Sequence, residues 1–268
     1  MRSADENNVD TKRIRSLYQT NEYISKNPSL HEEDSPWKVS KIIPLVDKMF
    51  MLGHINSEEI NLLDIGGGAG LILRDISSYI ERSYGVRVNK YALDLSPGML
   101  EVQKKNNPGV KTLNEDICET SLANKKIDLA LMIDVLEHVP HPVNALKELK
   151  RISKMVIFKV PLENNILCNT MNIITHGKIR KDAAENIGHI NIYNCNSLKK
   201  QIKTNCGRIL DDDFTNVFDY YLASNYYRNK INNKTKALNY VASYTFKISP
   251  RLCSYLYNDF IMILTECK

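Results

Sequence analysis

From residue 61 onward, apolar and polar residues follow two patterns that alternate along the chain. Short apolar runs predict strands at 61–65, 88–95, 110–114, 127–133 and 155–160. Between and before them, apolar residues recur at helical spacing and predict helices at 42–50, 69–83, 96–106 and 142–152. Strands that alternate with helices of this length predict βαβ units built around a parallel sheet.

After residue 160 the alternation changes. We expect an inserted helix at 164–179, a helix at 196–205, and strands at 208–214 and 258–265. The roughly forty residues 215–257 are too many for a plain loop in a compact domain, so they predict a docked helical insertion or cap. Residues 1–35 are polar with little periodicity, and we expect them to form an arm ahead of one domain at 36–268.

The stretch LLDIGGGAG follows the first predicted strand and holds four of the chain's 11 glycines. A backbone without Cβ atoms can approach a ligand closely and direct its N–H groups at it. The residues predicted to do so are Gly66, Gly67, Gly68 and Gly70. Asp64, just before them, suits a cationic amino group better than a pyrophosphate, which points to a nucleoside that bears an amino acid.

Further acids stand at the ends of the next predicted strands. Asp94, with Leu95, follows the second strand and could accept hydrogen bonds from both ribose hydroxyls. Asp116, with Ile117, follows the third strand and could accept from an adenine amino group. Asp134 ends the fourth strand beside the glycine turn. Aspartate is also common in turns and helix caps, an alternative that weakens when these motifs occur together and in order.

In these motifs the sequence resembles the class I S-adenosylmethionine-dependent methyltransferases. LLDIGGGAG is similar to their glycine-rich motif, YALDLS to the acidic ribose motif and NEDI to the adenine motif. LALMIDVLEHVPHP, HINIYNCNSLKKQIKTNCGRI and the leader NPSLHEEDSPWK resemble segments of the small-molecule branch that includes ubiquinone and menaquinone biosynthesis enzymes. The resemblance covers about residues 35–214. It implies a Rossmann-like, seven-stranded, mostly parallel sheet with the last strand antiparallel and helices on both faces.

The resemblance implies S-adenosylmethionine as cofactor and a small-molecule methyl acceptor, with oxygen favoured by the quinone branch alone. A hydroxyl acceptor needs a base. His138, after the fourth strand, is the best-placed candidate, followed by His189 and Tyr193. Each histidine could instead order a loop over the pocket.

A metal is a weaker possibility. Asp134, Glu137 and His138 form an acidic-x-x-Glu-His set that is associated with a divalent metal in some quinone-type relatives. Such spacing alone is weak evidence, and we assign no metal ligand.

Two segments are candidates for shaping the acceptor pocket. Trp37 and Lys38 either line it or staple the first helix onto the sheet. Residues 215–257 carry eight of the 14 tyrosines and a net charge of +5, equal to that of the whole chain. Aromatic residues interleaved with basic ones suit peripheral membrane contact, a lipid-like substrate or a nucleic-acid strand. The alternative is a solvated cap whose tyrosines pack inward.

Composition is ordinary for a soluble globular protein, at 43% hydrophobic and 25% charged residues. A polar N-terminus and the lack of a long apolar run predict a cytoplasmic protein.

Two other functions stay open. One is RNA or protein methylation on the same fold, but IDVLEH stands where an NPPY-type tetrapeptide would be needed, so a nucleic-acid partner is not expected. The other is a catalytically silent cofactor-binding scaffold, which the intact motifs disfavour.

Overall fold

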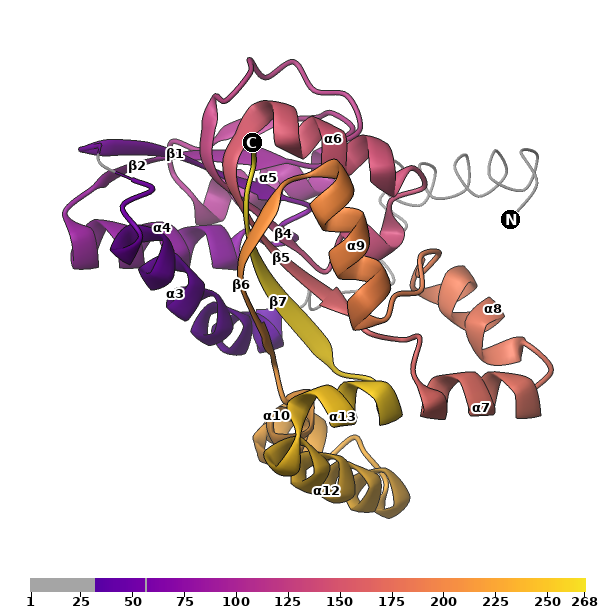
Figure 1. Ribbon diagram of the computed structural model, residues 1–268. Helices are drawn as coiled ribbons and strands as arrows, with labels where there is room; N and C mark the ends of the chain where they lie inside the picture. Colours follow the sequence, from indigo (N-terminus) through magenta and orange to yellow (C-terminus); the bar gives the residue numbers. More distant parts are fainter. Residues whose placement is uncertain (1–31, 56) are drawn as a thin grey trace.

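The computed structural model describes residues 32–55 and 57–268, which build one sheet covered by helices on both faces (Figure 1). The described strands are β1 Glu59–Ile65, β2 Arg87–Leu93, β3 Lys111–Leu113, β4 Ile127–Ile133, β5 Ser153–Pro161, β6 Arg208–Phe214 and β7 Phe260–Glu266. They lie in the order β3-β2-β1-β4-β5-β7-β6. Only β7 is antiparallel to its neighbours, β5 and β6. The predicted seven-stranded, mostly parallel sheet with an antiparallel last strand is confirmed.

Two apolar cores lie on opposite faces of the sheet. Helices α3 Ser35–Met51, α4 Leu71–Tyr84 and α5 Pro97–Asn106 cover one face, and α6 Pro142–Ile152 and α9 Cys195–Asn205 cover the other. Along β4, Leu129 and Leu131 belong to the first core, while Ala130 and Met132 belong to the second. A strand that is buried on both faces must be apolar throughout, which explains why 127–133 is easily read from the sequence.

Two expectations need correction. The single helix predicted at 164–179 is a pair, α7 Ile166–Ile174 and α8 Lys178–Asn186, because His176 and Gly177 adopt left-handed backbone conformations with φ of 49° and 85° and break it. The arm expected at 1–35 ends too late, since a short 3-10 helix, η1 Glu32–Asp34, leads directly into α3 at Ser35. The rest of that arm, 1–31, lies outside the described residues.

Residues 215–257 form the helical cap that their length predicts. Its helices are α10 Val217–Ala223, α11 Asn225–Arg228, α12 Asn233–Ile248 and α13 Pro250–Leu256. The buried carboxylate of Asp259 holds its base by accepting hydrogen bonds from the Thr215 hydroxyl at 2.8 Å and from the backbone N–H groups of Asn216 and Val217 at 3.1 Å. Among the described residues, no helix is both long and apolar enough to cross a bilayer.

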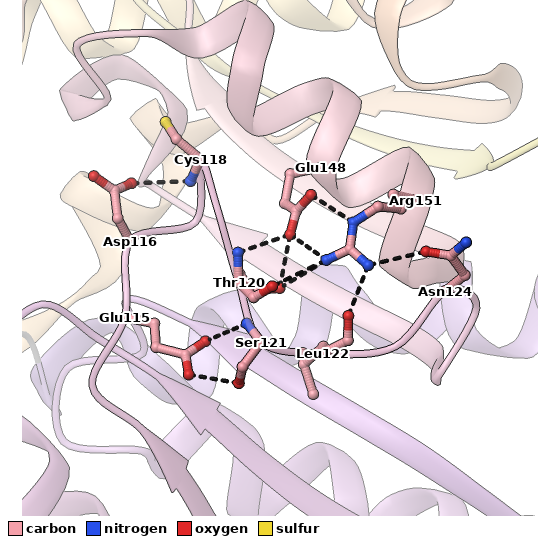
Figure 2. Close-up of polar contacts among 9 residues, drawn as sticks. All are labelled: Glu115, Asp116, Cys118, Thr120, Ser121, Leu122, Asn124, Glu148 and Arg151. Carbon is pink, nitrogen blue, oxygen red and sulfur yellow. Dashed lines mark hydrogen bonds and ion pairs between the residues drawn. The ribbon is translucent and has the colours of Figure 1, made fainter.

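The loop between β3 and β4 is fixed to α6 by a polar network (Figure 2). The Arg151 guanidinium donates to the Leu122 carbonyl at 2.7 Å and to the Asn124 side chain at 2.9 Å. It also pairs with Glu148 at 2.6 Å, and Glu148 accepts from the Thr120 backbone N–H at 2.8 Å. Buried and half-buried loop carbonyls are satisfied in this way, so the loop that begins with Asp116 keeps one conformation.

This network predicts the effect of replacing Arg151. The variant Arg151→Met should lower the free energy of unfolding by about 1–2 kcal/mol, because several loop oxygens lose their donor while staying partly buried. It should also weaken S-adenosylmethionine binding, because the Asp116 loop loosens. Urea unfolding and calorimetric titration measure the two effects. Lys150→Met, on the exposed side of the same helix, is the matched control and should change neither.

Candidate cofactor and acceptor site

A cavity of about 380 Å³ lies where β1, β2 and β4 end. Parallel strands place their carboxyl ends at one edge, and ligands bind there where the strand order reverses. The cavity is lined by every residue predicted to bind the cofactor except Gly70, and by two of the three candidates for the base: Asp64, Gly66, Gly67, Gly68, Asp94, Leu95, Asp116, Ile117, Asp134, His138 and His189. Residues from five separate segments of the sequence therefore meet in one place.

The glycine turn needs its glycines for two reasons. Gly66 and Gly68 have φ of 61° and 55°, in the left-handed region that side chains rarely adopt. Gly67 instead lacks space, because a Cβ there would lie 2.1 Å from Oδ2 of Asp64. The turn thus brings its backbone against the Asp64 carboxylate.

Gly70 differs from the other three. It precedes α4 with φ of 77°, and a Cβ there would meet the Asn107 side chain at 2.7 Å. Nδ2 atoms of Asn106 and Asn107, at the end of α5, donate to the carbonyls of Ala69 and Gly70 at 2.9 Å. Gly70 therefore supports the turn and does not line the cavity, and its expected role as a cofactor contact stays a prediction.

Two carboxyl groups in the cavity are buried and near each other. Oδ2 of Asp64 has no hydrogen-bond partner in the protein. Burial raises the pKa of Asp64 to about 7, with a further upward contribution from Asp94 and an opposing one from Lys38. Burial also raises the pKa of Asp94 to about 6, although its Oδ1 accepts from the Ser96 N–H at 2.8 Å. Such an uncompensated pair suits a ligand that brings a cation and hydroxyl donors.

Asp134 lies in a chain of alternating charges. Its Oδ1 is 2.5 Å from Nζ of the buried Lys159, and its Oδ2 is 3.1 Å from Nζ of Lys38, which also contacts Asp34 at 3.0 Å. Burial alone would lower the pKa of Lys38, but Asp134 and Asp34 outweigh it and raise this pKa. Both oxygens of Asp134 are thus engaged by lysines, and its predicted role as a cofactor contact stays a prediction.

Aromatic side chains form the rest of the cavity wall. The Trp37 ring stacks on Tyr220 with centroids 4.6 Å apart and meets Phe260 edge-on at 6.4 Å. Tyr221 and Tyr227 of the cap complete this wall. Trp37 and Lys38 both line the cavity, which is the first of the two alternatives considered from the sequence.

Part of this wall was not predicted residue by residue. Asp34, Lys159 and Phe260 were not singled out, and Tyr220, Tyr221 and Tyr227 were expected only as members of the segment 215–257. Lys159 carried a usable signal, because a lysine inside an otherwise apolar buried strand needs a buried partner. The individual tyrosines could not be chosen from the sequence, because the docking of the cap decides which of them reach the cavity.

The two segments that resemble the quinone branch dock on each other. The Glu137 carbonyl accepts from the N–H groups of Ile190 and Asn191, both at 3.0 Å. This brings the rings of His138 and His189 together with centroids 4.8 Å apart. Nδ1 of His189 is 2.8 Å from a carboxylate oxygen of Glu163.

Tyr193, the third candidate for a base, lies elsewhere. Its side chain is buried, does not line the cavity, and its hydroxyl has no partner in the protein. Burial raises the pKa of Tyr193 further above its ordinary value, which makes it a poor proton acceptor.

Among the described residues, one group of three could hold a metal ion: Glu137, His138 and His189, whose ligand atoms lie within 4.8 Å of one another. Asp134, part of the set considered from the sequence, does not join it because its oxygens bond to lysines. Burial raises the pKa of Glu137 well above its ordinary value, and the Asp134 charge adds to this. A cation would therefore have to displace a proton from Glu137.

Comparisons with known proteins agree with this geometry. Residues 63–155 match the family model described as a methyltransferase domain. The mitochondrial ubiquinone biosynthesis O-methyltransferase of Candida albicans is 33% identical over 111 residues, which make up 37% of this chain and 31% of that protein. The chain thus matches about a third of the length of this curated relative.

Solved structures share the fold at low sequence identity. Geranyl diphosphate C-methyltransferase from Streptomyces coelicolor A3(2), solved with Mg²⁺, geranyl diphosphate and S-adenosyl-L-homocysteine, is 12% identical, with a TM-score of 0.53 over 83% of this chain and 80% of that one. A geranyl diphosphate methyltransferase in complex with S-adenosylmethionine is 12% identical, with a TM-score of 0.53 over 84% and 85%. Residues 63–155 are thus similar to a methyltransferase domain, and the chain shares the fold of these solved methyltransferases.

The contact between Gly67 and Asp64 predicts a sharp effect. Gly67→Ala should weaken S-adenosylmethionine binding about tenfold or more, because the new Cβ must displace the Asp64 carboxylate. The fold should persist, because the change is confined to the turn. Circular dichroism, which reports secondary structure, checks this. Gly85→Ala is the control, because Gly85 has a left-handed φ of 66° but open space around it. Equal affinities for wild type and Gly67→Ala would contradict the assignment.

The raised pKa values predict how cofactor binding depends on pH. Asp64 and Asp94 are protonated below about pH 7 and pH 6 respectively, and a neutral carboxyl attracts a cationic amino group weakly. Affinity for S-adenosylmethionine should therefore rise between about pH 6 and pH 8. Calorimetric titrations across this range should show a flatter profile for Asp64→Asn. Asp213→Asn, an exposed carboxylate on β6, should keep the wild-type slope.

Proposed function

We propose that this protein transfers the methyl group of S-adenosylmethionine to an oxygen atom of a small, largely apolar molecule. The observation that carries the proposal is that one cavity joins the glycine turn and strand-end carboxyls to an aromatic wall. Support for oxygen comes from the curated relative, which is named an O-methyltransferase.

The glycine turn and strand-end acids would hold the cofactor. Asp64, with an unpartnered buried oxygen, fits the cationic amino group, and Asp94 fits the ribose hydroxyls. Asp116 and Ile117 fit the adenine, on a loop already held by α6. The bound cofactor supplies a methyl group that its positively charged sulfur already activates. The protein's task is to position the acceptor and exclude water.

The aromatic wall would receive the acceptor. Trp37, Tyr220 and Phe260 offer flat apolar surfaces, which suit a ring or an unsaturated chain. Lys38 and Lys159 are each paired with a carboxylate, so the charge chain contributes little net charge to this wall. An acceptor without a strong charge fits better than an anionic one.

His189 is the best candidate for the base. With Glu163 accepting the Nδ1 proton, the imidazole keeps a lone pair on Nε2, which can take a proton from an acceptor hydroxyl. The Glu163 carboxylate then stabilises the imidazolium. His138, whose ring contacts that of His189, is the second candidate.

The alternative functions and the cellular location stay predictions. RNA or protein methylation and a silent scaffold are the alternatives, and measured transfer separates them. A cytoplasmic location stays a prediction. The curated relative is named mitochondrial, and that description belongs to the relative.

The proposed base predicts a specific kinetic defect. His189→Gln should lower kcat about 100-fold, because the acceptor hydroxyl loses its proton acceptor, while affinity for S-adenosylmethionine stays the same. Single-turnover methyl transfer and calorimetry measure the two quantities. His141→Gln, an exposed histidine at the start of α6, should behave as wild type. An unchanged kcat in His189→Gln would remove His189 from the proposal.

The acceptor class can be identified with S-adenosylmethionine that carries a radiolabelled methyl group. The purified protein is incubated with this cofactor and a cell extract, and the lipid, small-molecule, RNA and protein fractions are then separated. Label in the lipid or small-molecule fraction is the expected result. Label confined to RNA or protein would overturn the proposed acceptor, and bound cofactor without any transfer would favour the scaffold.

A further inference from the structure

The solvent-facing side of α12 carries several large apolar and aromatic side chains, whereas a helix on a soluble domain usually turns polar residues to water. The side of α12 that packs inward contains Asn239, Ala242 and Ser243. The opposite side exposes large apolar or aromatic side chains, with exposed fractions of 66% for Tyr240, 54% for Val241, 68% for Tyr244 and 67% for Ile248. Residues three and four positions apart lie on one face of a helix, so these four form a continuous stripe.

The stripe extends onto neighbouring helices. On α13, which packs against α12, Leu252 and Tyr255 are exposed. Helix α7 contacts α13 and exposes Ile173 and Ile174. Figure 1 shows α7, α12 and α13 at the same end of the molecule, beyond the start of β7. We use the name apolar stripe for the exposed apolar and aromatic residues of the two cap helices: Tyr240, Val241, Tyr244 and Ile248 of α12, and Leu252 and Tyr255 of α13.

The cap itself carries charges of one sign. Residues 220–257 contain six basic residues and no acidic one: Arg228, Lys230, Lys234, Lys236, Lys247 and Arg251. The preceding acid, Asp219, is hydrogen-bonded to Ser243 and Asn216. The nearest acidic segment is on β6, which contacts α13 and carries Asp211, Asp212 and Asp213, so the cationic character belongs to the cap.

We propose that the apolar stripe docks on the surface of a membrane that contains anionic phospholipids. Aliphatic side chains such as Val241 and Ile248 would enter the boundary between headgroups and acyl chains. Tyrosines are suited to the headgroup level, with an apolar ring and a polar hydroxyl. Lys247 and Arg251 would contact lipid phosphates, which gives this surface both of the signals that stable peripheral binding requires.

Other occupants fit these observations less well. A symmetric contact with a second copy would bring two cationic surfaces together, and their repulsion would oppose it. A nucleic-acid strand would use the basic residues and tyrosines, but it would leave Val241, Ile248 and Leu252 without apolar partners.

Membrane docking would also orient the cavity, a point that rests on the proposed function. Helix α10 packs on α12 and lines the cavity through Val217, Tyr220 and Tyr221. Because the apolar stripe faces away from α10, the helices of the cap would then lie between the lipid and the acceptor end of the cavity.

Vesicle sedimentation tests the proposal without cofactor or acceptor. The full chain is mixed with vesicles of phosphatidylcholine alone, or of phosphatidylcholine and phosphatidylserine in equal parts. Binding is expected to the second kind only. Replacing Lys247 and Arg251 together with glutamine should lower the partition coefficient about 30-fold. Replacing Val241 and Ile248 together with serine should lower it about tenfold.

Two controls carry the same chemical changes elsewhere. One control replaces Lys200 and Lys203 on α9 with glutamine, and the other is Met51→Ser at the end of α3. Both should leave vesicle binding unchanged. No binding by the wild type would overturn the proposal, as would equal losses in the controls. Binding to RNA in place of vesicles, or a dimer that the serine variant dissociates, would also overturn it. Because no methyl transfer is measured, a failure here is distinct from a failure of the proposed enzyme activity.

Discussion

The order of the strands is the constraint on which the site depends. The sheet grows from β1 to β3 in one direction and then restarts on the other side of β1 with β4. The connecting helices on either side of this reversal leave toward opposite faces, so the carboxyl ends of β1 and β4 stay open. Asp64, Asp94 and Asp134 end adjacent strands, and their closeness follows from this topology alone.

A buried chain of charges links this edge to distant parts of the sequence. Asp134 follows β4, Lys159 lies on β5, and Lys38 with Asp34 comes from the start of α3. Removing one member would leave a buried charge uncompensated, which usually costs more than the intact pair contributes. The cap is attached to the same place, because Tyr220 stacks on Trp37 and donates a hydrogen bond to the Glu33 carbonyl. The cofactor and acceptor ends of the cavity are thus held by one connected set of contacts.

Local patterns in the sequence predict the sheet, the glycine turn and the strand-end acids because each depends on a few consecutive residues. Strand β4 is apolar at every position except Asp128, and Gly66 and Gly68 have backbone conformations that few other residues adopt. The acceptor wall could not be predicted in this way. Tyr221 reaches the cavity only because Asp259, some forty positions later, holds the base of the cap. Similarly, the pairing of Asp134 could not be predicted, because the two lysines that bind its carboxylate are distant in sequence.

The most direct test of the central claim is a calorimetric titration of the purified chain with S-adenosylmethionine, beside the variant Asp94→Ala. Saturable binding of a single molecule per chain is predicted for the wild type, with affinity at least about tenfold lower for the variant, because the ribose hydroxyls lose their acceptor. An absence of binding by the folded wild type, or equal affinity in the two proteins, would contradict the assignment of this cavity.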